Sequence, residues 1–176
     1  MSDNNSRKVL TKREQERLLS QINRENITGE RNYLLIKLIL NTGLRLSPIC
    51  NLTWNQVDLI NNIILLKDNK RRISLDDELV NLLSSWNQRQ LKELGENRKF
   101  IFTSMSKGVK GKRISKRYVQ DMIKRYAEHA EINKNVSPKI LRYTYAYNLY
   151  QDSKSFKEVK EKFPSSSLDT INKYFK

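Results

Sequence analysis

The sequence has very few of the residues that build disulfide bonds and metal centres. Among its 176 residues there is one cysteine, Cys50, and one histidine, His129. A single cysteine excludes an internal disulfide and fits a reducing compartment such as the cytoplasm. One residue of each type cannot build a Cys/His zinc site or a multi-histidine site. Since the acidic residues show no metal-ligand spacing either, we expect no metal and no cofactor.

Long apolar runs and glycine-rich phosphate loops are also missing. The most apolar stretch, 34–40, is interrupted by Lys37 and is far shorter than the roughly 20 residues that span a membrane. Residues 1–8 are polar and lack the apolar region of a signal peptide. No glycine-rich loop of the nucleotide-binding type occurs. We therefore expect neither a membrane partner nor a small-molecule substrate.

Positive charge, in contrast, is abundant. The chain has 34 Lys and Arg against 19 Asp and Glu, which gives a net charge of +15. Such an excess is typical of proteins that bind a polyanion, usually nucleic acid. The alternative is a cationic surface with no partner, but solubility alone requires much less charge.

The apolar spacing predicts an α+β chain that is mostly helical, with a small three-stranded antiparallel sheet on one edge. We expect a flexible N-terminal arm over residues 1–10 and a single domain over residues 11–176. Turn-forming pairs separate three short β-type runs. The expected strands are 57–59, 63–66 and 72–75.

Capping signals predict where the helices begin and end. Thr11 and Glu14 have the spacing of a capping box, and an apolar helix over 30–42 should end at Gly43. Ser47-Pro48 predicts an N-cap followed by a first-turn proline. Further helices are expected over 76–94, from Ser115 to about 130, over 137–151, over 156–163 and over 165–174.

Arginines, lysines, hydroxyls and tyrosines are the reactive groups that remain, and they suit phosphoryl transfer without a metal. Arg45 lies in the bend that follows Gly43. Lys139 and Arg142 share one face in the first turn of a helix, where a bound phosphate would offset their repulsion from the helix dipole. The alternatives are an arginine packed against a helix end and a solvated basic face.

Two further basic segments are candidates for contact with nucleic acid. The hairpin between the second and third expected strands carries Lys67, Lys70, Arg71 and Arg72. A glycine- and lysine-rich loop carries Lys107, Lys110, Lys112 and Arg113. Such basic tips can follow a phosphate backbone, although charged hairpin turns are also common without any ligand.

In their order along the chain, these features resemble the tyrosine recombinase (phage integrase) family, over almost the whole sequence. Thr42–Ser47 (TGLRLS) is similar to the family's first-arginine box, and Ser137–Tyr143 (SPKILRY) to its His-x-x-Arg box. Lys67 corresponds to the β-hairpin lysine, and 168–174 to the segment that ends in the nucleophilic tyrosine.

The resemblance implies a site-specific recombinase or integrase of a mobile element such as a virus or plasmid. It would act on double-stranded DNA as a dimer or tetramer, in the cytoplasm, without metal or ATP. Arg45, Lys139 and Arg142 would hold the scissile phosphate, and Tyr174 would attack it to form a 3′-phosphotyrosyl link. Lys67 would protonate the leaving 5′ oxygen, with Lys70 as its rival.

The chain departs from the family pattern at several positions. Lys139 replaces the box histidine, Ser165 occupies the later histidine or tryptophan position, and Pro48 stands where an acidic residue usually follows Arg45. The N-terminal core-binding domain is expected to be absent. Rival nucleophiles lie on the helix after Arg142: Tyr143, Tyr145, Tyr147 and Tyr150.

Three alternatives follow from these departures. The chain could be a catalytically weak DNA-binding relative with an accessory or regulatory role, or a type IB topoisomerase-like enzyme that relaxes DNA without exchanging partners. It could also be an unrelated helical DNA-binding module. The last alternative predicts that Tyr174 is remote from Arg45 and Arg142.

Overall fold

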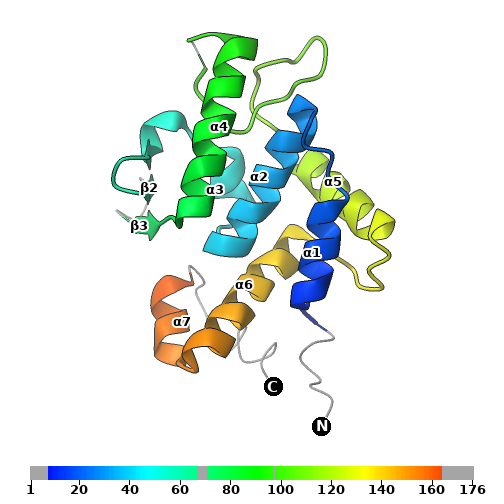
Figure 1. Cartoon of the computed structure of the whole chain (residues 1–176), viewed down its shortest axis with the longest axis vertical. Helices are drawn as coiled ribbons and strands as arrows, with labels where there is room; N and C mark the ends of the chain where they lie inside the picture. The colour runs from blue at the N-terminus through cyan, green and yellow to red at the C-terminus, as the bar shows by residue number, and fades with distance from the viewer. Residues whose placement is uncertain (1–7, 67–70, 97, 164–176) are drawn as a thin grey trace.

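Helix α2 (Ile27–Thr42) runs through the middle of the molecule, and α4 (Asp77–Leu94) and α6 (Pro138–Ser153) pack against it (Figure 1). Side chains all around α2 are buried, including Leu35 and Leu38. An all-round apolar helix of this kind belongs in a core rather than at a surface. The helix therefore forms the support on which the elements of the candidate site are built.

The computed structural model describes residues 8–66, 71–96 and 98–163. Besides α2, α4 and α6, its helices are α1 (Lys12–Ser20), α3 (Leu46–Cys50), the short 3-10 helix η2 (Trp54–Gln56), α5 (Lys116–His129) and α7 (Phe156–Lys162). Its strands are β1 (Val57–Asp58), β2 (Ile63–Leu66) and β3 (Arg71–Ser74). The expected mostly helical fold with a small sheet is confirmed.

The three strands form one antiparallel sheet in the order β1-β2-β3. Ile64 of β2 pairs with Val57 on one side and with Ile73 on the other. Between β1 and β2, the Asp58 carboxylate accepts hydrogen bonds from the backbone of Ile60 and Asn61 and closes the turn. The sheet is as predicted, although β1 ends one residue early and β3 is shifted by one residue. The turn from β2 to β3 lies outside the described residues.

Most of the predicted capping residues are confirmed. Side-chain oxygens of Thr11, Ser115 and Ser137 accept hydrogen bonds from the first turns of α1, α5 and α6. Gly43 and Gly95 end α2 and α4 with positive φ angles. The helix expected over 165–174 lies outside the described residues.

Two predicted helix starts are wrong. Helix α2 begins at Ile27 rather than residue 30, because Asn26 caps it by accepting a hydrogen bond from the Gly29 amide. Helix α3 begins at Leu46, and Arg45 rather than Ser47 occupies the N-cap position. Pro48 is tolerated inside this first turn because the amide groups there have no intrahelical partner.

The predicted flexible arm does not hold for its last two residues. Val9 and Leu10 are each only 1% exposed. The Leu10 amide donates to Thr144 Oγ1 at 3.0 Å, and Lys134 Nζ donates to the Val9 carbonyl at 2.8 Å. Residues 9 and 10 are therefore fixed against α6 and the segment that precedes it.

Within the described part of the chain, no helix is long and apolar enough to cross a membrane. The same residues contain no group of three or more His, Cys, Asp or Glu side chains that could hold a metal ion.

Candidate active site

The bend after α2 presents Arg45 to solvent. Gly43 ends the helix in the left-handed conformation, with a φ of 62°, and the buried Leu44 side chain anchors the next residue in the core. Thr42 Oγ1 accepts a hydrogen bond from the Leu44 amide at 3.3 Å. Arg45 then stands exposed at the start of α3. Its position is set by the backbone, and its guanidinium makes no hydrogen bond to the described residues.

Helix α6 brings Arg142 to the same bend. Ser137 caps the helix, so that Arg142 lies on its second turn facing the end of α2. Arg142 Nε donates to the Gly43 carbonyl at 2.8 Å. The guanidinium also lies over the Phe163 ring, 5.0 Å from its centroid. A helix terminus and an aromatic ring therefore fix the orientation of this half-buried arginine.

Gly43 is required where α2 meets α6. A Cβ atom at this position would lie 2.5 Å from Tyr145 Cδ1 and 3.0 Å from Phe163 Cδ2. Real Cβ contacts are longer, and the positive φ is itself strained for any residue with a side chain. The glycine of the first-arginine box thus allows the close approach that lets its carbonyl reach Arg142.

The charge on Arg142 is only partly compensated. Burial, together with the positive charge of Arg45, lowers the pKa of Arg142 to about 10. Its Nη2 atom is buried and has no hydrogen-bond partner among the described residues. Because an unpaired buried donor is costly, a bound anion would stabilise this group. The guanidinium is therefore held in place with one donor still available.

A cleft of about 360 Å³ brings together the three predicted phosphate-binding residues. Its lining residues are Arg45, Leu46, Gln120, Ser137, Pro138, Lys139 and Arg142. Lys139 is exposed, and its ammonium lies 5.8 Å from the centroid of the Tyr143 ring. The sequence placed Arg45 and Arg142 far apart in the chain, and the fold places them in one cleft. Their catalytic roles stay predictions.

The other predicted catalytic residues, and one predicted DNA contact, cannot be placed. Lys67, Lys70, Ser165 and Tyr174 lie outside the described residues. The prediction that Tyr174 is the nucleophile therefore stays a prediction.

The rival tyrosines occupy structural positions on α6. Tyr143 is buried at 4% exposure, with its ring centroid 6.1 Å from that of Phe163. Burial raises the pKa of Tyr145. Tyr150 packs against Phe156 with ring centroids 4.4 Å apart. A buried phenol with a raised pKa is a poor nucleophile, which argues against Tyr145. All four tyrosines, Tyr147 included, pack in one apolar cluster with Val159 and Phe163, so their surroundings favour core packing.

The predicted DNA-contacting residues of the hairpin differ in their surroundings. Arg71 Nη2 donates to the Lys162 carbonyl, at the end of α7. Burial lowers the pKa of Arg71. Arg72, the next residue in β3, is exposed and makes no side-chain hydrogen bond to the described residues. In the free protein Arg71 holds the sheet to α7, while Arg72 is available to a ligand.

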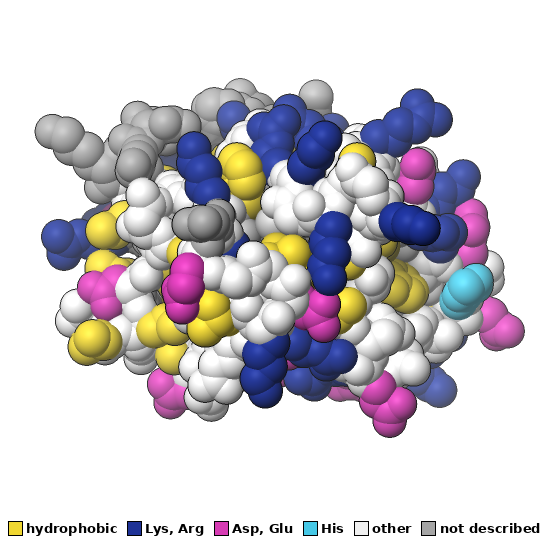
Figure 2. All heavy atoms as spheres, turned by 90° about the horizontal axis from the view of Figure 1, so that it is seen from above, with side chains coloured by type: hydrophobic (Ala, Val, Ile, Leu, Met, Phe, Trp, Pro, Cys, Tyr) yellow, Lys and Arg dark blue, Asp and Glu magenta, His cyan; other side chains and the backbone are white. Residues whose placement is uncertain are grey.

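In the basic loop, two of the four predicted residues are engaged. Lys110 forms an ion pair with Glu93 at 2.8 Å, and Arg113 Nη1 donates to Asn51 Oδ1. Lys107 and Lys112 are exposed, with no side-chain hydrogen bond to the described residues. Figure 2 shows the molecule from above, and on this face Lys and Arg side chains gather along the upper rim. Other Lys and Arg side chains on the same face are interspersed with acidic ones.

Sequence reasoning did not identify several residues that shape the cleft. Phe163 supports the Arg142 guanidinium, and Gln120 of α5 lines the wall. Neither has a local signal, because each reaches the cleft only through packing of separate helices. The glycine of TGLR was recognised as a helix end, but its contact with Arg142 was not foreseen.

The phage integrase family model matches residues 8–176 of this chain. A tyrosine recombinase of Agathobacter rectalis is 28% identical over 163 residues, which cover 90% of this chain and 52% of that protein. Tyrosine recombinase XerA of Thermococcus kodakarensis is 28% identical over 169 residues, covering 96% of this chain and 58% of that protein. The chain thus spans about half the length of these curated relatives.

Solved structures share the fold. The crystal structure of XerA recombinase superposes with a TM-score of 0.80 at 24% identity, covering 96% of this chain and 60% of that one. The structure of XerH site-specific recombinase bound to its palindromic difH substrate, a post-cleavage complex, gives a TM-score of 0.75 at 25% identity. That match covers 94% of this chain and 48% of the other. The predicted architecture is confirmed by these likenesses.

Proposed function

This chain belongs to the phage integrase family, and on that premise we propose that it is a site-specific DNA recombinase. It cleaves and rejoins strands of double-stranded DNA through a 3′-phosphotyrosyl intermediate. One observation carries the proposal: the buried Nη2 donor of Arg142 has no partner among the described residues and belongs to a cleft that also contains Arg45 and Lys139. Three cations around one cleft suit a phosphodiester.

Arg45, Arg142 and Lys139 hold the non-bridging oxygens of the scissile phosphate. As the phosphorus becomes five-coordinate, negative charge builds on those oxygens, and donors that are already in place stabilise it. The Gly43 carbonyl and the Phe163 ring keep the Arg142 guanidinium oriented, so little rearrangement is needed at the moment of reaction. Ser165 contributes a further hydrogen bond to the phosphate.

In the cleavage step, the Tyr174 hydroxyl gives up its proton to solvent as its oxygen forms a bond to phosphorus, and the bond to the 5′ oxygen breaks. Lys67 gives the leaving oxygen its proton, so the products are a 3′-phosphotyrosyl link and a free 5′-hydroxyl. In the second step, a 5′-hydroxyl of a partner strand gives its proton back to Lys67 and its oxygen attacks the same phosphorus. The bond to Tyr174 breaks, and the tyrosine oxygen takes up a proton from solvent. The covalent link conserves the energy of the phosphodiester, which is why neither ATP nor a metal is required.

Strand exchange requires two duplexes to be held together, so we propose that the chain assembles as a dimer or tetramer on DNA. The basic hairpin and loop would contact the backbone beside the cleaved site, mainly through phosphates. The exposed residues Arg72, Lys107 and Lys112 are the available contacts in the free protein.

The deciding experiment is covalent trapping on a nicked suicide duplex, followed by mapping of the linked residue by mass spectrometry. We expect the wild-type chain to form an adduct at Tyr174, and Tyr174→Phe to bind DNA without forming it. An adduct with Tyr174→Phe would refute the nucleophile assignment. Binding without any adduct by the wild type would favour the accessory relative, which the replacement of the box histidine by Lys139 also suggests.

A further inference from the structure

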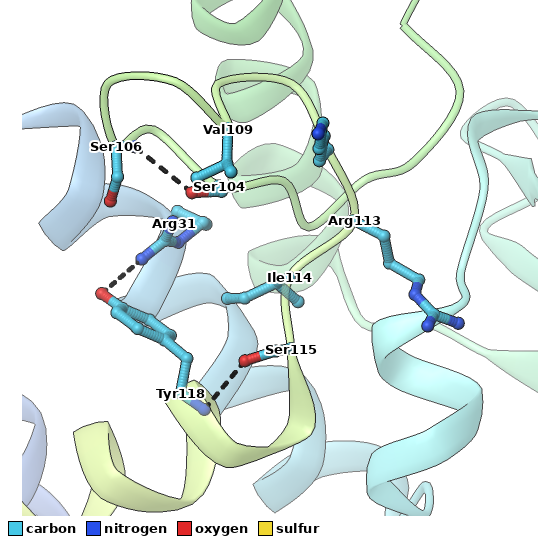
Figure 3. Close-up of a pocket in the computed structure, with 9 residues that line it drawn as sticks. Arg31, Ser104, Ser106, Val109, Arg113, Ile114, Ser115 and Tyr118 are labelled. Carbon is cyan, nitrogen blue, oxygen red and sulfur yellow. Dashed lines mark hydrogen bonds between the residues drawn. The ribbon is translucent and has the colours of Figure 1, made fainter.

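A second cavity lies apart from the cleft that contains Arg142. It encloses about 350 Å³ between the start of α2, the loop over 104–115 and the first turn of α5, and it shares no lining residue with that cleft (Figure 3). The mechanism proposed above makes no use of it. Its floor is a buried arginine, and its rim is part of the basic loop.

Arg31 is the buried arginine, with only 2% of its surface exposed. Its Nη1 donates to the Thr103 carbonyl at 2.8 Å, and its Nη2 donates to the Tyr118 hydroxyl and to Asn32 Oδ1, each at 2.7 Å. All of these acceptors are neutral. No acidic side chain of the described residues pairs with Arg31. The fold has therefore buried a cation and supplied dipoles but no counter-charge.

A buried cation without a counter-charge favours the entry of an anion. Moving a charge out of water is expensive unless an opposite charge joins it, and neutral hydrogen bonds return only part of that cost. Burial accordingly lowers the pKa of Arg31. An anion bound beside the guanidinium would offset this penalty, so the pocket selects for negative charge.

The rim of the pocket adds hydrogen-bond donors that also favour a negatively charged ligand. Lys112 lines it, and its ammonium makes no hydrogen bond to the described residues. Ser106 brings a hydroxyl group. The N-terminus of α5 also faces the pocket through Ser115, and no acidic residue occupies the first turn of that helix to satisfy its dipole. Figure 3 shows that Arg113 points away, toward α3.

Backbone hydrogen bonds hold the pocket wall in shape. The Ser104 amide donates to the Lys112 carbonyl at 2.7 Å, and the Gly111 amide donates to the Ser104 carbonyl at 2.9 Å. Thr103 and Arg113 form an antiparallel bridge below them. Because this part of the loop pairs with the segment that Arg31 holds, the backbone of Lys112 has a defined place in the pocket wall rather than on a free tip.

We propose that this pocket is a second phosphate-binding site, which takes a backbone phosphate of the DNA other than the scissile one. Lys112 and Ser106 are its ligands, and the charge of the buried Arg31, whose donors are largely used by Thr103, Asn32 and Tyr118, attracts the anion. The proposal rests on the proposed function, since the DNA is the source of that phosphate. Such a contact would fix the duplex against α5 and so help set which phosphodiester reaches the cleft at Arg142.

The test uses inorganic phosphate as the probe and thermal unfolding as the readout. Replacing Arg31 would leave its hydrogen-bond acceptors without a donor and destabilise the fold. The informative change is therefore Lys112→Gln, with Lys107→Gln as its control. Lys107 has the same charge in the same loop but does not line the pocket. Both changes are made in an Arg45→Ala chain, so that phosphate binding in the cleft at Arg142 is weakened and contributes equally to each variant.

At ten times the dissociation constant, phosphate should raise the Tm of the Arg45→Ala chain by about 3–6 °C over chloride of equal ionic strength. Arg45→Ala/Lys107→Gln should show the same rise, and Arg45→Ala/Lys112→Gln less than half of it. The Nε–H resonance of Arg31 should shift with the same apparent affinity. Equal rises in the Lys107 and Lys112 variants, or no rise at all, would overturn the site.

A second arm identifies the source of the phosphate. When the chain is saturated with duplex DNA, added phosphate should no longer raise the Tm, because a backbone phosphate already fills the pocket. A rise that persists would overturn DNA as the source and assign the pocket to a free phosphate. Failure of covalent trapping at Tyr174, with the Lys112-dependent rise intact, would refute strand cleavage and leave the phosphate site standing.

Discussion

Arg31 and Arg142 stand beside two separate cavities, and neither has an acidic partner among the described residues. Arg31 uses three of its nitrogens to bind Thr103, Asn32 and Tyr118. Arg142 has one hydrogen bond, from Nε to the Gly43 carbonyl, and its buried Nη2 has none within the described part of the chain. The first arginine therefore mainly holds the fold together, and the second keeps a donor for a ligand.

The comparison predicts opposite consequences for the two arginines. Arg142→Met should lower the single-turnover rate of covalent adduct formation about 10²–10³-fold, because a preset donor to the transition state is lost. Its free energy of unfolding should change by no more than about 1 kcal/mol, since losing the bond to Gly43 is offset by removing a buried charge. Suicide-substrate kinetics and urea unfolding measure the two effects. A variant that cleaves normally would remove Arg142 from the chemistry.

Arg31→Met should act mainly on stability. Three acceptors, two of them buried and the Tyr118 hydroxyl half-buried, lose their donor, and the free energy of unfolding should fall by about 2–4 kcal/mol. Urea denaturation of the two Met variants side by side makes the comparison direct. If Arg31→Met is as stable as the wild type, the hydrogen bonds to Thr103, Asn32 and Tyr118 do not support the fold, and the contrast between the two arginines fails.

Gly43→Ala should damage the support of Arg142 and leave the Arg31 pocket intact. The added Cβ meets Tyr145 and Phe163 at a positive φ, so stability should fall by about 2–3 kcal/mol. Gly108→Ala is the matched control. Its φ is also positive, at 82°, but nothing lies within 4 Å of its Cβ position.

Gly108→Ala should lower the free energy of unfolding by only about 1 kcal/mol. That loss is the part of the Gly43→Ala effect that comes from the positive φ alone. Equal losses in the two variants, measured by thermal unfolding, would show that the packing of Gly43 against α6 is unimportant. In that case the bend would support Arg142 less than the contact distances suggest.

Tyr118→Phe and its control Tyr126→Phe should have smaller effects than Arg31→Met or Gly43→Ala. Tyr118→Phe removes one acceptor from Arg31 and should cost about 1.5–2 kcal/mol, because the bond involves a charged donor. Tyr126→Phe removes a bond between neutral groups, from Asn32 Nδ2, and should cost nearer 1 kcal/mol. Neither change should alter the rate of adduct formation. A fall in that rate with Tyr118→Phe would mean that the two cavities are coupled.

Local signals predicted most of the secondary structure. Capping side chains at Thr11, Ser115 and Ser137 act on amides within three residues, so the sequence contains all that is needed to recognise them. The start of α3 was misplaced because Ser47-Pro48 is an equally good local signal for a cap. In the structure Leu44 is buried and Arg45 takes the N-cap position instead, and burial is not visible in a local pattern.

The sequence by itself determined the charge of this chain, the order of its boxes and therefore its family. Only the tertiary structure decided how the two arginines are used. Arg142 meets the Gly43 carbonyl across 99 residues of chain, and Arg31 meets the Thr103 carbonyl across 72. Contacts at such separations depend on how whole helices pack. That packing leaves one guanidinium donor free beside a cleft and surrounds another guanidinium with neutral acceptors.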